Sequence, residues 1–279
     1  AQQRYEDSTN PSNNGDGQGP ACRDQQLVGN GRVLIGTGTG YEERNISNGE
    51  KIFELTSFPG TLSAHRLRNG NTLLTGMNWL GKQGVVLVEV DALGTLKRMI
   101  NYPPTFTYIR LVRETPTGTF LVAAEDTVFE GNAAGDVLWK VKVSGPPDKP
   151  HVWQALRLAN GQTLISAGYS ANLQVFEPNG TQSKIITGPA TVTPHFFGGF
   201  QVLANGNYVI TNWQGHGTAF GEKGLHLLEY TPAGELVWLW KQDATKYSSL
   251  QGVIVLDGLD INLMHSEDGK GMLAPVKMK

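Results

Sequence analysis

Short glycine turns recur along the chain at nearly even intervals, and each is flanked by apolar, strand-like sequence. The strings NGNTLLTGMN around Gly70 and NGNYVITNWQ around Gly206 show the pattern most clearly. Asn-Gly between two apolar runs is a strong hairpin signal, because both turn residues must take a positive φ. The first-turn glycines of successive units are Gly31, Gly70, Gly118, Gly161, Gly206 and Gly258. A spacing of roughly 40–45 residues is typical of one β-propeller blade.

A second glycine turn follows inside every unit except the last, and another strand-like segment comes after it. These second-turn glycines are Gly49, Gly94, Gly135, Gly180 and Gly234. Two hairpins in one unit give four short antiparallel strands. The absence of a 3.6-residue apolar period excludes a helical solenoid, and a β-sandwich would not repeat both turns in register. We therefore predict an all-β fold in which residues 25–279 form a single β-propeller domain.

Six repeat units are visible, so six four-stranded blades are expected, with seven as the alternative if residues 1–30 contain a divergent blade. The sixth unit ends after about three strands. Residues 1–24 form a polar N-terminal tail without the apolar area to fold alone. Because an open sheet edge is a hazard, we expect some part of the stretch from Ala1 to Gln26 to complete the sixth blade or to join a neighbouring molecule.

The composition limits the classes of partner. The formal net charge is −2 and charged residues make up 17% of the chain, so no nucleic-acid partner is expected. No apolar run approaches the roughly 20 residues of a membrane span. Cys22 is the single cysteine, which excludes an internal disulfide. Low lysine content with many Asn, Gly and Thr residues favours a secreted or periplasmic protein.

The turns carry a sequence pattern as well as a spacing. Asn69-Gly70-Asn71 and Asn205-Gly206-Asn207 precede strands, and the turns at Gly135 and Gly234 lead into strands that carry Trp139 and Trp238. These repeats resemble the pyrroloquinoline-quinone-like (PQQ-like) β-propeller superfamily, and also the propeller of arylsulfotransferases, over about residues 25–279. The resemblance implies the fold and leaves the function open, because that superfamily contains enzymes, assembly scaffolds and binding proteins. Its quinone-dependent members usually have eight blades and adjacent cysteines, so no quinone or other cofactor is expected.

A propeller binds ligands where its loops and innermost strands converge at one end of the channel. If the first strand of each unit is innermost, the residues that enter this strand are the candidates. We predict His151, His195, Arg110 and Tyr108 as candidate catalytic residues. Imidazole titrates near neutral pH, and a guanidinium holds a carboxylate or sulfate in a bidentate fork. No carboxylate pair lies at these positions, which disfavours two-carboxylate glycoside hydrolysis.

Other polar and aromatic residues at equivalent positions would bind a ligand without reacting with it. The string NWQGHG, from Asn212 to Gly217, is the most distinctive of these stretches. The candidate ligand-binding residues are His65, Trp153, Gln154, Trp213, Gln214, His216 and Tyr247. Aromatic rings stack on sugar faces and polar groups bond hydroxyls, although each histidine has a structural, hydrogen-bonded role as its alternative. No residue spacing matches a metal site, so no metal is expected.

Two functions follow from this pattern. The first is a secreted binding or scaffold protein that binds carbohydrate or another polar ligand, or that self-assembles, including through the N-terminal tail. The alternative is an enzyme that acts on a carbohydrate, or on a sulfated or acidic ligand, with a histidine as general base. Clustering of His151, His195, Arg110 and Tyr108 within hydrogen-bond reach of one cavity would favour the enzyme. Their dispersal would favour the binding protein.

Overall fold

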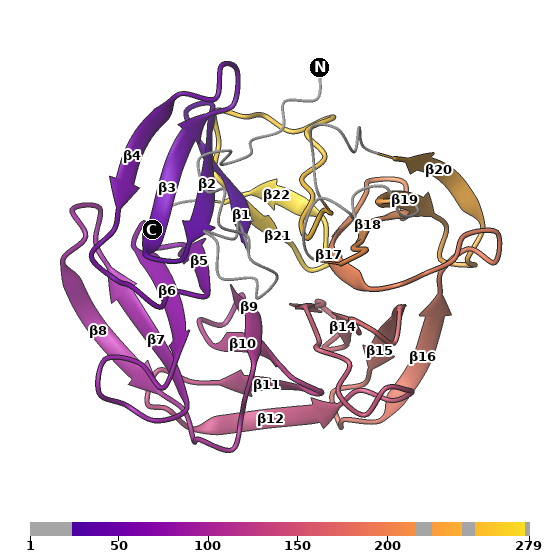
Figure 1. Ribbon diagram of the computed structural model, residues 1–279, viewed down its shortest axis with the longest axis horizontal. Coiled ribbons are helices and arrows are strands. Elements are labelled where there is room, and N and C mark those ends of the chain that lie inside the picture. The colour runs from indigo at the N-terminus through magenta and orange to yellow at the C-terminus, as the bar shows by residue number, and fades with distance from the viewer. Residues whose placement is uncertain (1–23, 216–224, 242–248, 277–279) are drawn as a thin grey trace.

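The structure is a computed structural model that describes residues 24–215, 225–241 and 249–276. In this part of the chain, five four-stranded antiparallel sheets and one two-stranded hairpin surround a central channel (Figure 1). Within each four-stranded sheet the strands neighbour one another in chain order, as they do in a propeller blade. The prediction of an all-β propeller is therefore confirmed, whereas the prediction of six or seven four-stranded blades is wrong.

The first three blades are built from consecutive strands. Blade 1 holds β1 (Gln25–Gly29), β2 (Arg32–Thr37), β3 (Gly40–Asn45) and β4 (Lys51–Leu55). Blade 2 holds β5 (Ser63–Arg66), β6 (Thr72–Met77), β7 (Val85–Val90) and β8 (Leu96–Asn101). Blade 3 holds β9 (Ile109–Glu114), β10 (Phe120–Ala124), β11 (Thr127–Gly131) and β12 (Val137–Lys142).

The next two blades follow the same order. Blade 4 holds β13 (Gln154–Arg157), β14 (Thr163–Ser166), β15 (Asn172–Phe176) and β16 (Gln182–Thr187). Blade 5 holds β17 (Phe197–Val202), β18 (Tyr208–Asn212), β19 (Leu227–Tyr230) and β20 (Leu236–Trp240). The last two strands, β21 (His265–Glu267) and β22 (Leu273–Pro275), pair only with each other as a sheet.

The Asn-Gly-Asn sequence makes the first turn of a blade in a specific way. Gly70 takes a φ of 87°, as the sequence pattern predicts, but Asn69 does not take the positive φ expected of both turn residues. The side-chain oxygen of Asn69 accepts a hydrogen bond from the N–H of Asn71 at 3.0 Å. Asn205 holds Asn207 in the same way, also at 3.0 Å. Such side-chain-to-backbone bonds stabilise the turn locally, which is why the motif marks these hairpins so clearly.

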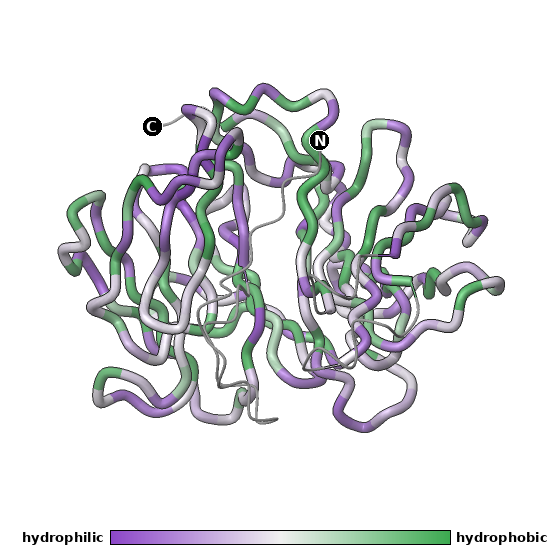
Figure 2. Tube along the Cα trace, turned by 45° about the horizontal axis from the view of Figure 1, so that its top comes forward, coloured by the Kyte–Doolittle hydropathy of each residue, from purple (hydrophilic) through white to green (hydrophobic). Residues whose placement is uncertain are grey.

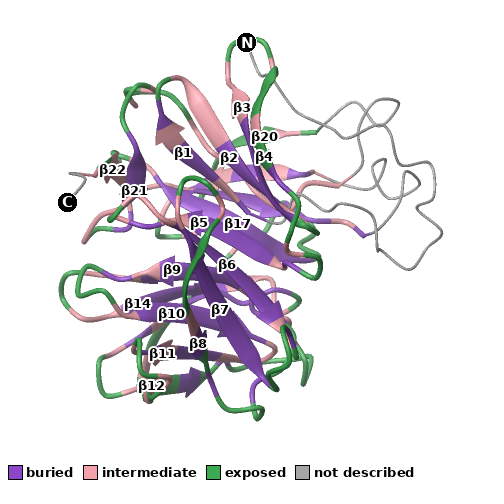
Figure 3. Ribbon diagram, turned by 90° about the vertical axis from the view of Figure 1, so that its left-hand side faces the viewer, coloured by how far each residue is buried: buried purple, intermediate pink, exposed green. Residues whose placement is uncertain are grey.

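The strands differ in burial from the axis outward. From blade 2 on, the first strand of each blade contacts the first and second strands of the preceding blade, and all six residues of β17 are buried. The fourth strands are the most exposed, as the rim of Figure 3 shows. The apolar core lies between adjacent sheets, where Leu73 and Leu87 of blade 2 pack with Val112 and Phe120 of blade 3. Hydrophobic and hydrophilic segments are accordingly distributed around the whole ring (Figure 2).

The sixth sequence repeat does not become a blade. Its turn forms, since Gly258 takes a φ of 79°, but residues 251–263 form no strand on either side of it. The apolar stretch before the turn lies along β17. There the Gln201 side chain donates a hydrogen bond to the carbonyl of Val255 at 3.3 Å and accepts one from its N–H at 2.8 Å. The Gln201 side chain thus takes the place of a strand partner for the backbone groups of Val255.

The hairpin of β21 and β22 instead joins the first and fifth blades. Met264, just before β21, forms an antiparallel bridge with Val28 of β1, and Met272 forms a parallel bridge with Val202 of β17. In Figure 1 the yellow hairpin lies between these two blades. Apart from Asp24, the N-terminal tail lies outside the described residues, so its predicted pairing stays a prediction. Among the described residues, no helix is long and apolar enough to cross a membrane.

Candidate functional site

The topology brings two sets of loops to one end of the ring. The first strand of each blade begins where the second strand ends, because the strands alternate in direction. We call this end the proximal face. In blades 3 to 5 it receives the residues that precede the first strand and the residues that follow the second. These are Tyr108, Glu125, His151, Tyr169, His195 and Trp213, with Arg110 in β9 beside them.

A continuous aromatic row runs across the proximal face of these three blades. The ring centroids of Tyr108 and His151 lie 4.2 Å apart, and those of His151 and Tyr169 lie 5.7 Å apart. Tyr169 continues to His195 at 5.8 Å and to Trp213 at 6.4 Å, and His195 stacks on Trp213 at 6.2 Å. Most of these distances fall in the range of favourable aromatic pairs. We call Tyr108, His151, Tyr169, His195 and Trp213 the aromatic row.

A buried apolar cluster supports the row from below. Leu111, Trp153, Phe196 and Trp213 pack together, and the Phe196 ring lies edge-on to Tyr169 at 4.8 Å. The cluster anchors the row, whereas Tyr108 and Tyr169 keep 48% and 37% of their surface exposed. The row thus combines a rigid base with rings that solvent or a ligand can reach.

Arg110 is the cation of this face. Its guanidinium carbon lies 4.0 Å from the ring centre of Tyr108 and 5.3 Å from that of Trp153. One Nη atom donates to the carbonyl of Ile109 at 3.2 Å, and the Nε atom is buried without a partner. No carboxylate pairs with Arg110 in the described part of the chain. The arginines there that do have a carboxylate partner are Arg32, Arg44, Arg66, Arg68, Arg98, Arg113 and Arg157.

His151 and Glu125 lie next to each other on this face. The Nδ1 atom of His151 lies 3.4 Å from an oxygen of Glu125. Burial lowers the pKa of His151 below its usual value; the Glu125 carboxylate opposes this shift, whereas Arg110 and Lys149 add to it. The imidazole is therefore neutral near pH 7.

The backbone around this pair is strained. Tyr108, Glu125 and His151 take φ values of 57°, 49° and 56°, in the left-handed region that bulky residues rarely adopt. Each such residue costs about 1–3 kcal/mol, and strain of this kind gathers at functional sites. The N–H of Val152 donates to the carbonyl of Glu125 at 2.7 Å, which holds two of the strained residues together.

The other sequence-predicted residues lie elsewhere. His65 and Gln154 are buried and line a cavity in the central channel. Gln214 follows Trp213 and donates a hydrogen bond to the backbone carbonyl of Asn212 at 3.0 Å. His216 and Tyr247 lie outside the described residues. The structure thus brings Tyr108, Arg110, His151, Trp153, His195 and Trp213 together on one face, and their functional roles stay predictions.

Sequence reasoning did not find two members of the face, Glu125 and Tyr169. Both follow the second strand of a blade, as Trp213 does. The sequence could have identified them, because the hairpin that places the start of the first strand at this face also places the end of the second strand there.

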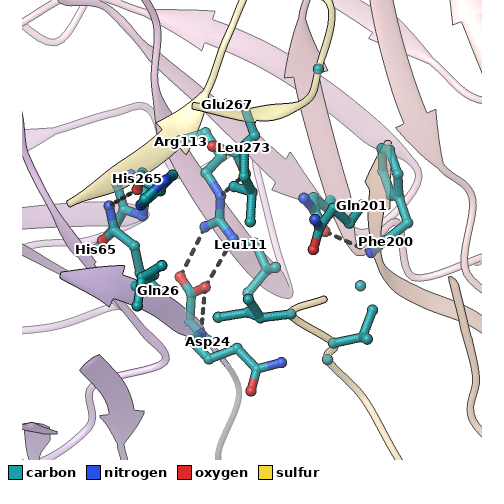
Figure 4. Close-up of a pocket in the computed structure, with 18 residues that line it drawn as sticks. Asp24, Gln26, His65, Leu111, Arg113, Phe200, Gln201, His265, Glu267 and Leu273 are labelled. Atoms are coloured by element: carbon teal, nitrogen blue, oxygen red, sulfur yellow. Dashed lines mark hydrogen bonds and ion pairs between the residues drawn. The ribbon is translucent and has the colours of Figure 1, made fainter. Parts of the chain in front are cut away.

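The central channel holds a second polar cluster, of which sequence reasoning named only His65 and Gln154 (Figure 4). The cavity has a volume of about 40 Å³, which is room for a few water molecules and too little for a sugar. Its polar lining includes Asp24, Gln26, His65, Arg113, Gln154, Gln201, His265 and Glu267. Within the described ranges, no group of three or more His, Cys, Asp or Glu side chains is arranged to hold a metal ion.

Comparison with known proteins gives the class of fold. No protein-family model and no curated protein sequence matches the chain. A solved protein of unknown function from Bacteroides caccae is similar, with a TM-score of 0.68 and 22% identity, over 84% of this chain and 86% of that chain. A catalytically inactive variant of virginiamycin B lyase from Staphylococcus aureus, solved with quinupristin, has a TM-score of 0.56 and 11% identity, over 92% and 86%.

A third similar structure is the extracellular domain of a protein described as a hybrid two-component system from Bacteroides thetaiotaomicron. It has a TM-score of 0.51 and 10% identity, over 81% of this chain and 29% of that chain. At these identities the likeness shows a shared β-propeller fold. The arrangement of the proximal face must therefore carry any functional argument.

Proposed function

We propose that this propeller is a secreted or periplasmic binding protein whose proximal face holds an acidic carbohydrate or a similar polar, anionic ligand. The observation that carries the proposal is the aromatic row, with its exposed rings Tyr108 and Tyr169, beside Arg110, which has no carboxylate partner among the described residues. An exposed apolar surface rimmed by polar groups marks a binding site. The likeness to an extracellular domain supports the location outside the cytoplasm.

Each part of the face has a separate role in this proposal. The exposed rings of Tyr108 and Tyr169 offer apolar faces to a sugar ring, while their hydroxyl groups bond sugar hydroxyls. Arg110 supplies the positive charge for a carboxylate or sulfate. Because Tyr108 and Trp153 cover the guanidinium, its charge is less screened by water than that of a surface arginine.

The spacing of the two histidines favours binding over catalysis. The rings of His151 and His195 each lie next to Tyr169, at 5.7 and 5.8 Å. Tyr169 therefore links the two imidazoles, and no hydrogen bond joins them in the described structure. A pair of general acid and base groups would need to reach one reacting atom within about 3 Å.

An enzyme that uses His151 as general base is the second candidate, and the Glu125 contact supports it. A neutral imidazole accepts a proton, and a carboxylate at Nδ1 stabilises the resulting imidazolium. One of the similar structures is a lyase, so the same fold can carry an enzymatic site. Ligand turnover that is lost in His151→Gln while ligand affinity persists would establish it, and unchanged ligand after prolonged incubation would remove it.

A glycan array containing neutral and acidic oligosaccharides tests the binding proposal. We expect acidic members to bind, and isothermal titration of the best ligand to show at least a tenfold loss of affinity for Tyr169→Ala. Arg110→Gln should lose affinity for the acidic ligand and keep what affinity the neutral analogue has. Phe58→Ala is the matched control, because Phe58 lies in the loop before blade 2, packs edge-on to Trp79 at 6.2 Å and is not a member of the aromatic row.

The outcomes separate the two parts of the proposal. If Arg110→Gln leaves the ratio of the affinities for the acidic and the neutral ligand as it is in the wild-type chain, the anionic part of the proposal alone is contradicted. Full affinity of Tyr169→Ala, or an equal loss for Phe58→Ala, would contradict the site itself.

A further inference from the structure

The two ring nitrogens of His151 lie in different surroundings. The Nδ1 atom is buried and lies 3.4 Å from a buried oxygen of Glu125, and neither atom has a hydrogen bond in the described structure. The Nε2 atom is not buried in this way, and the His151 side chain keeps 22% of its surface exposed. A ligand on the aromatic row therefore reaches His151 at Nε2.

The carboxylate of Glu125 decides which nitrogen carries the proton of the neutral ring. An ionised carboxylate accepts hydrogen bonds and donates none, so it favours a proton on the Nδ1 atom that faces it. Nε2 is then the nitrogen with the free lone pair. In this state His151 can accept a hydrogen bond from a ligand hydroxyl group, whereas it repels an anionic oxygen.

Uptake of one proton reverses this preference. The proton binds to Nε2, because Nδ1 already carries one, and the outward nitrogen becomes a donor on a positively charged ring. Such a charged donor attracts an anionic oxygen more strongly than a neutral hydroxyl group. The carboxylate of Glu125 behind the ring stabilises the added charge, since it favours the protonated form of His151.

Arg110 and His151 act on the same ligand because both contact the ring of Tyr108. The guanidinium carbon lies 4.0 Å from the centre of this ring, and the centre of the imidazole lies 4.2 Å from it. The two groups are thus no further apart than about one Debye length, roughly 8–10 Å. After burial, the charge of Arg110 is one of the causes that lower the pKa of His151. An anion bound to Arg110 offsets this effect and therefore favours the protonated ring.

We propose that His151 sets the ligand specificity of the proximal face through its proton: the face binds an anionic ligand together with a proton on His151, and a neutral, hydroxyl-bearing ligand without one. This inference rests on the proposed binding site and adds how that site distinguishes acidic from neutral ligands. The groups that face His151 are the carboxylate of Glu125, the cations Arg110 and Lys149, and the rings of Tyr108 and Tyr169.

The coupling between anion and proton has a definite sign. A bound anion raises the pKa of His151, so the bound face carries more protons than the free face between the two titration midpoints. In that range the affinity for a sulfated ligand should rise as the pH falls, by up to about tenfold per pH unit. A sulfate group stays ionised throughout, so the ligand itself contributes no titration. The affinity for the neutral analogue should not rise.

Nuclear magnetic resonance of the imidazole groups tests the coupling, with inorganic sulfate as the probe. The six histidines of the full chain are labelled with carbon-13, and His151→Gln identifies the signal of His151. Chloride is then replaced by sulfate at constant ionic strength. We expect sulfate to raise the midpoint of the His151 titration more than that of His195, which lies beyond Tyr169 in the aromatic row.

Two variants assign the effect to its residues, and circular dichroism confirms that each is folded. Arg110→Gln should abolish the effect of sulfate while His151 still titrates. Glu125→Gln should lower the midpoint of His151 in chloride, because the carboxylate that favours the imidazolium is gone. The proposal is overturned by a shift at His151 no larger than at His195, by a sulfate effect that persists in Arg110→Gln, or by an unchanged midpoint in Glu125→Gln.

The result is separate from the test of the proposed function. A sulfate effect at His151, with no glycan bound on the array, would remove the carbohydrate ligand and support the coupling of an anion to the proton. Acidic glycans whose affinity is constant between about pH 5 and 7.5, together with no sulfate effect, would support the binding site and overturn the coupling.

Discussion

Arg113 of β9 donates two hydrogen bonds to the carboxylate of Asp24 inside the channel, at 3.0 and 2.9 Å. The Nε atom of the same guanidinium donates to Glu267 of β21 at 3.1 Å (Figure 4). Ser63 of β5 donates a further hydrogen bond to Asp24 at 2.7 Å. A single buried cation thus joins the residue before blade 1, the innermost strand of blade 3 and the C-terminal hairpin.

Arg113→Met should destabilise the ring strongly. The substitution keeps the apolar volume and removes the charge, so Asp24 and Glu267 are left buried without a cation. Breaking a buried ion pair from one side costs about 3–5 kcal/mol. Urea unfolding followed by tryptophan fluorescence measures this loss.

The control for Arg113 is an ion pair on the surface. Lys51 lies 2.8 Å from Glu54 on the exposed strand β4. Solvent screens this pair, so Lys51→Met should leave the midpoint of urea unfolding where it is. An equal shift for both variants would show that the channel network has no special role in stability.

His65 should make the stability depend on pH. Burial lowers the pKa of His65 well below its ordinary value of 6.5, and Arg113, Arg68 and Arg66 add to the shift. Since the folded-state pKa lies below the unfolded-state value, the unfolded chain binds more protons in acid. The free energy of unfolding should therefore fall as the pH drops below about 6.5, by up to about 1.4 kcal/mol per pH unit.

His65→Gln removes this titration and should make the decline between pH 6.5 and 5 less steep, with His151, whose pKa burial also lowers, contributing to what remains. The matched change at the exposed His195, His195→Gln, should leave the decline as it is in the wild-type chain. Urea unfolding at several pH values measures both. The same slope in wild-type and His65→Gln would assign the acid sensitivity to another group.

The fold could be predicted from sequence because its signals are local. The turns at Gly70 and Gly206 require a positive φ and are stabilised by the asparagine next to them, whatever the rest of the chain does. The same local character explains the wrong blade count. The turn at Gly258 forms, but a strand also needs a neighbouring strand to bond its backbone. The backbone of Val255, before this turn, bonds the side chain of Gln201.

The candidate site could be predicted from the sequence only where its residues are placed by the strand topology. Residues before a first strand must lie at one end of the ring, which placed Tyr108 and His151 on the same face. The pairing of Arg113 with Asp24 could not be predicted, because it depends on which side of β9 faces the channel. An alternating pattern of apolar residues does not decide that when both sides of a strand are buried.

Two buried tyrosines should respond oppositely to loss of their hydroxyl groups. The hydroxyl of Tyr102 donates to the carbonyl of Asn132 at 2.8 Å, whereas that of Tyr230 is buried without a partner. Tyr102→Phe leaves a carbonyl without its donor and should cost about 1 kcal/mol. Tyr230→Phe removes an unpaired polar group and should be neutral or stabilising by a similar amount. Thermal unfolding of both variants measures the difference, and destabilisation by Tyr230→Phe would indicate that its hydroxyl has a partner such as water.

Gly168 should be essential for the geometry of the proximal face. It follows β14 with a φ of 53°, and a Cβ atom there would overlap the carbonyl oxygens of Pro150 and His151. Gly206 also has a positive φ, 84°, but a Cβ atom there meets nothing within 4 Å. Gly206→Ala should therefore cost only the roughly 1–2 kcal/mol of a left-handed residue. Gly168→Ala bears that cost and must also move the backbone that carries His151.

We expect Gly168→Ala to lose more stability than Gly206→Ala in urea unfolding, and to lose ligand binding at the proximal face as well. The reason is that Gly168 ties the loops together, since the N–H of Phe197 donates to its carbonyl at 2.9 Å. A backbone shift at Gly168 would therefore displace both His151 and Phe197 at the start of β17. The rings of His151 and His195, on either side of Tyr169, would move with these two segments. Equal effects of the two substitutions on stability, with ligand affinity unchanged in Gly168→Ala, would mean that the close approach of these loops is not required for the arrangement of the aromatic row.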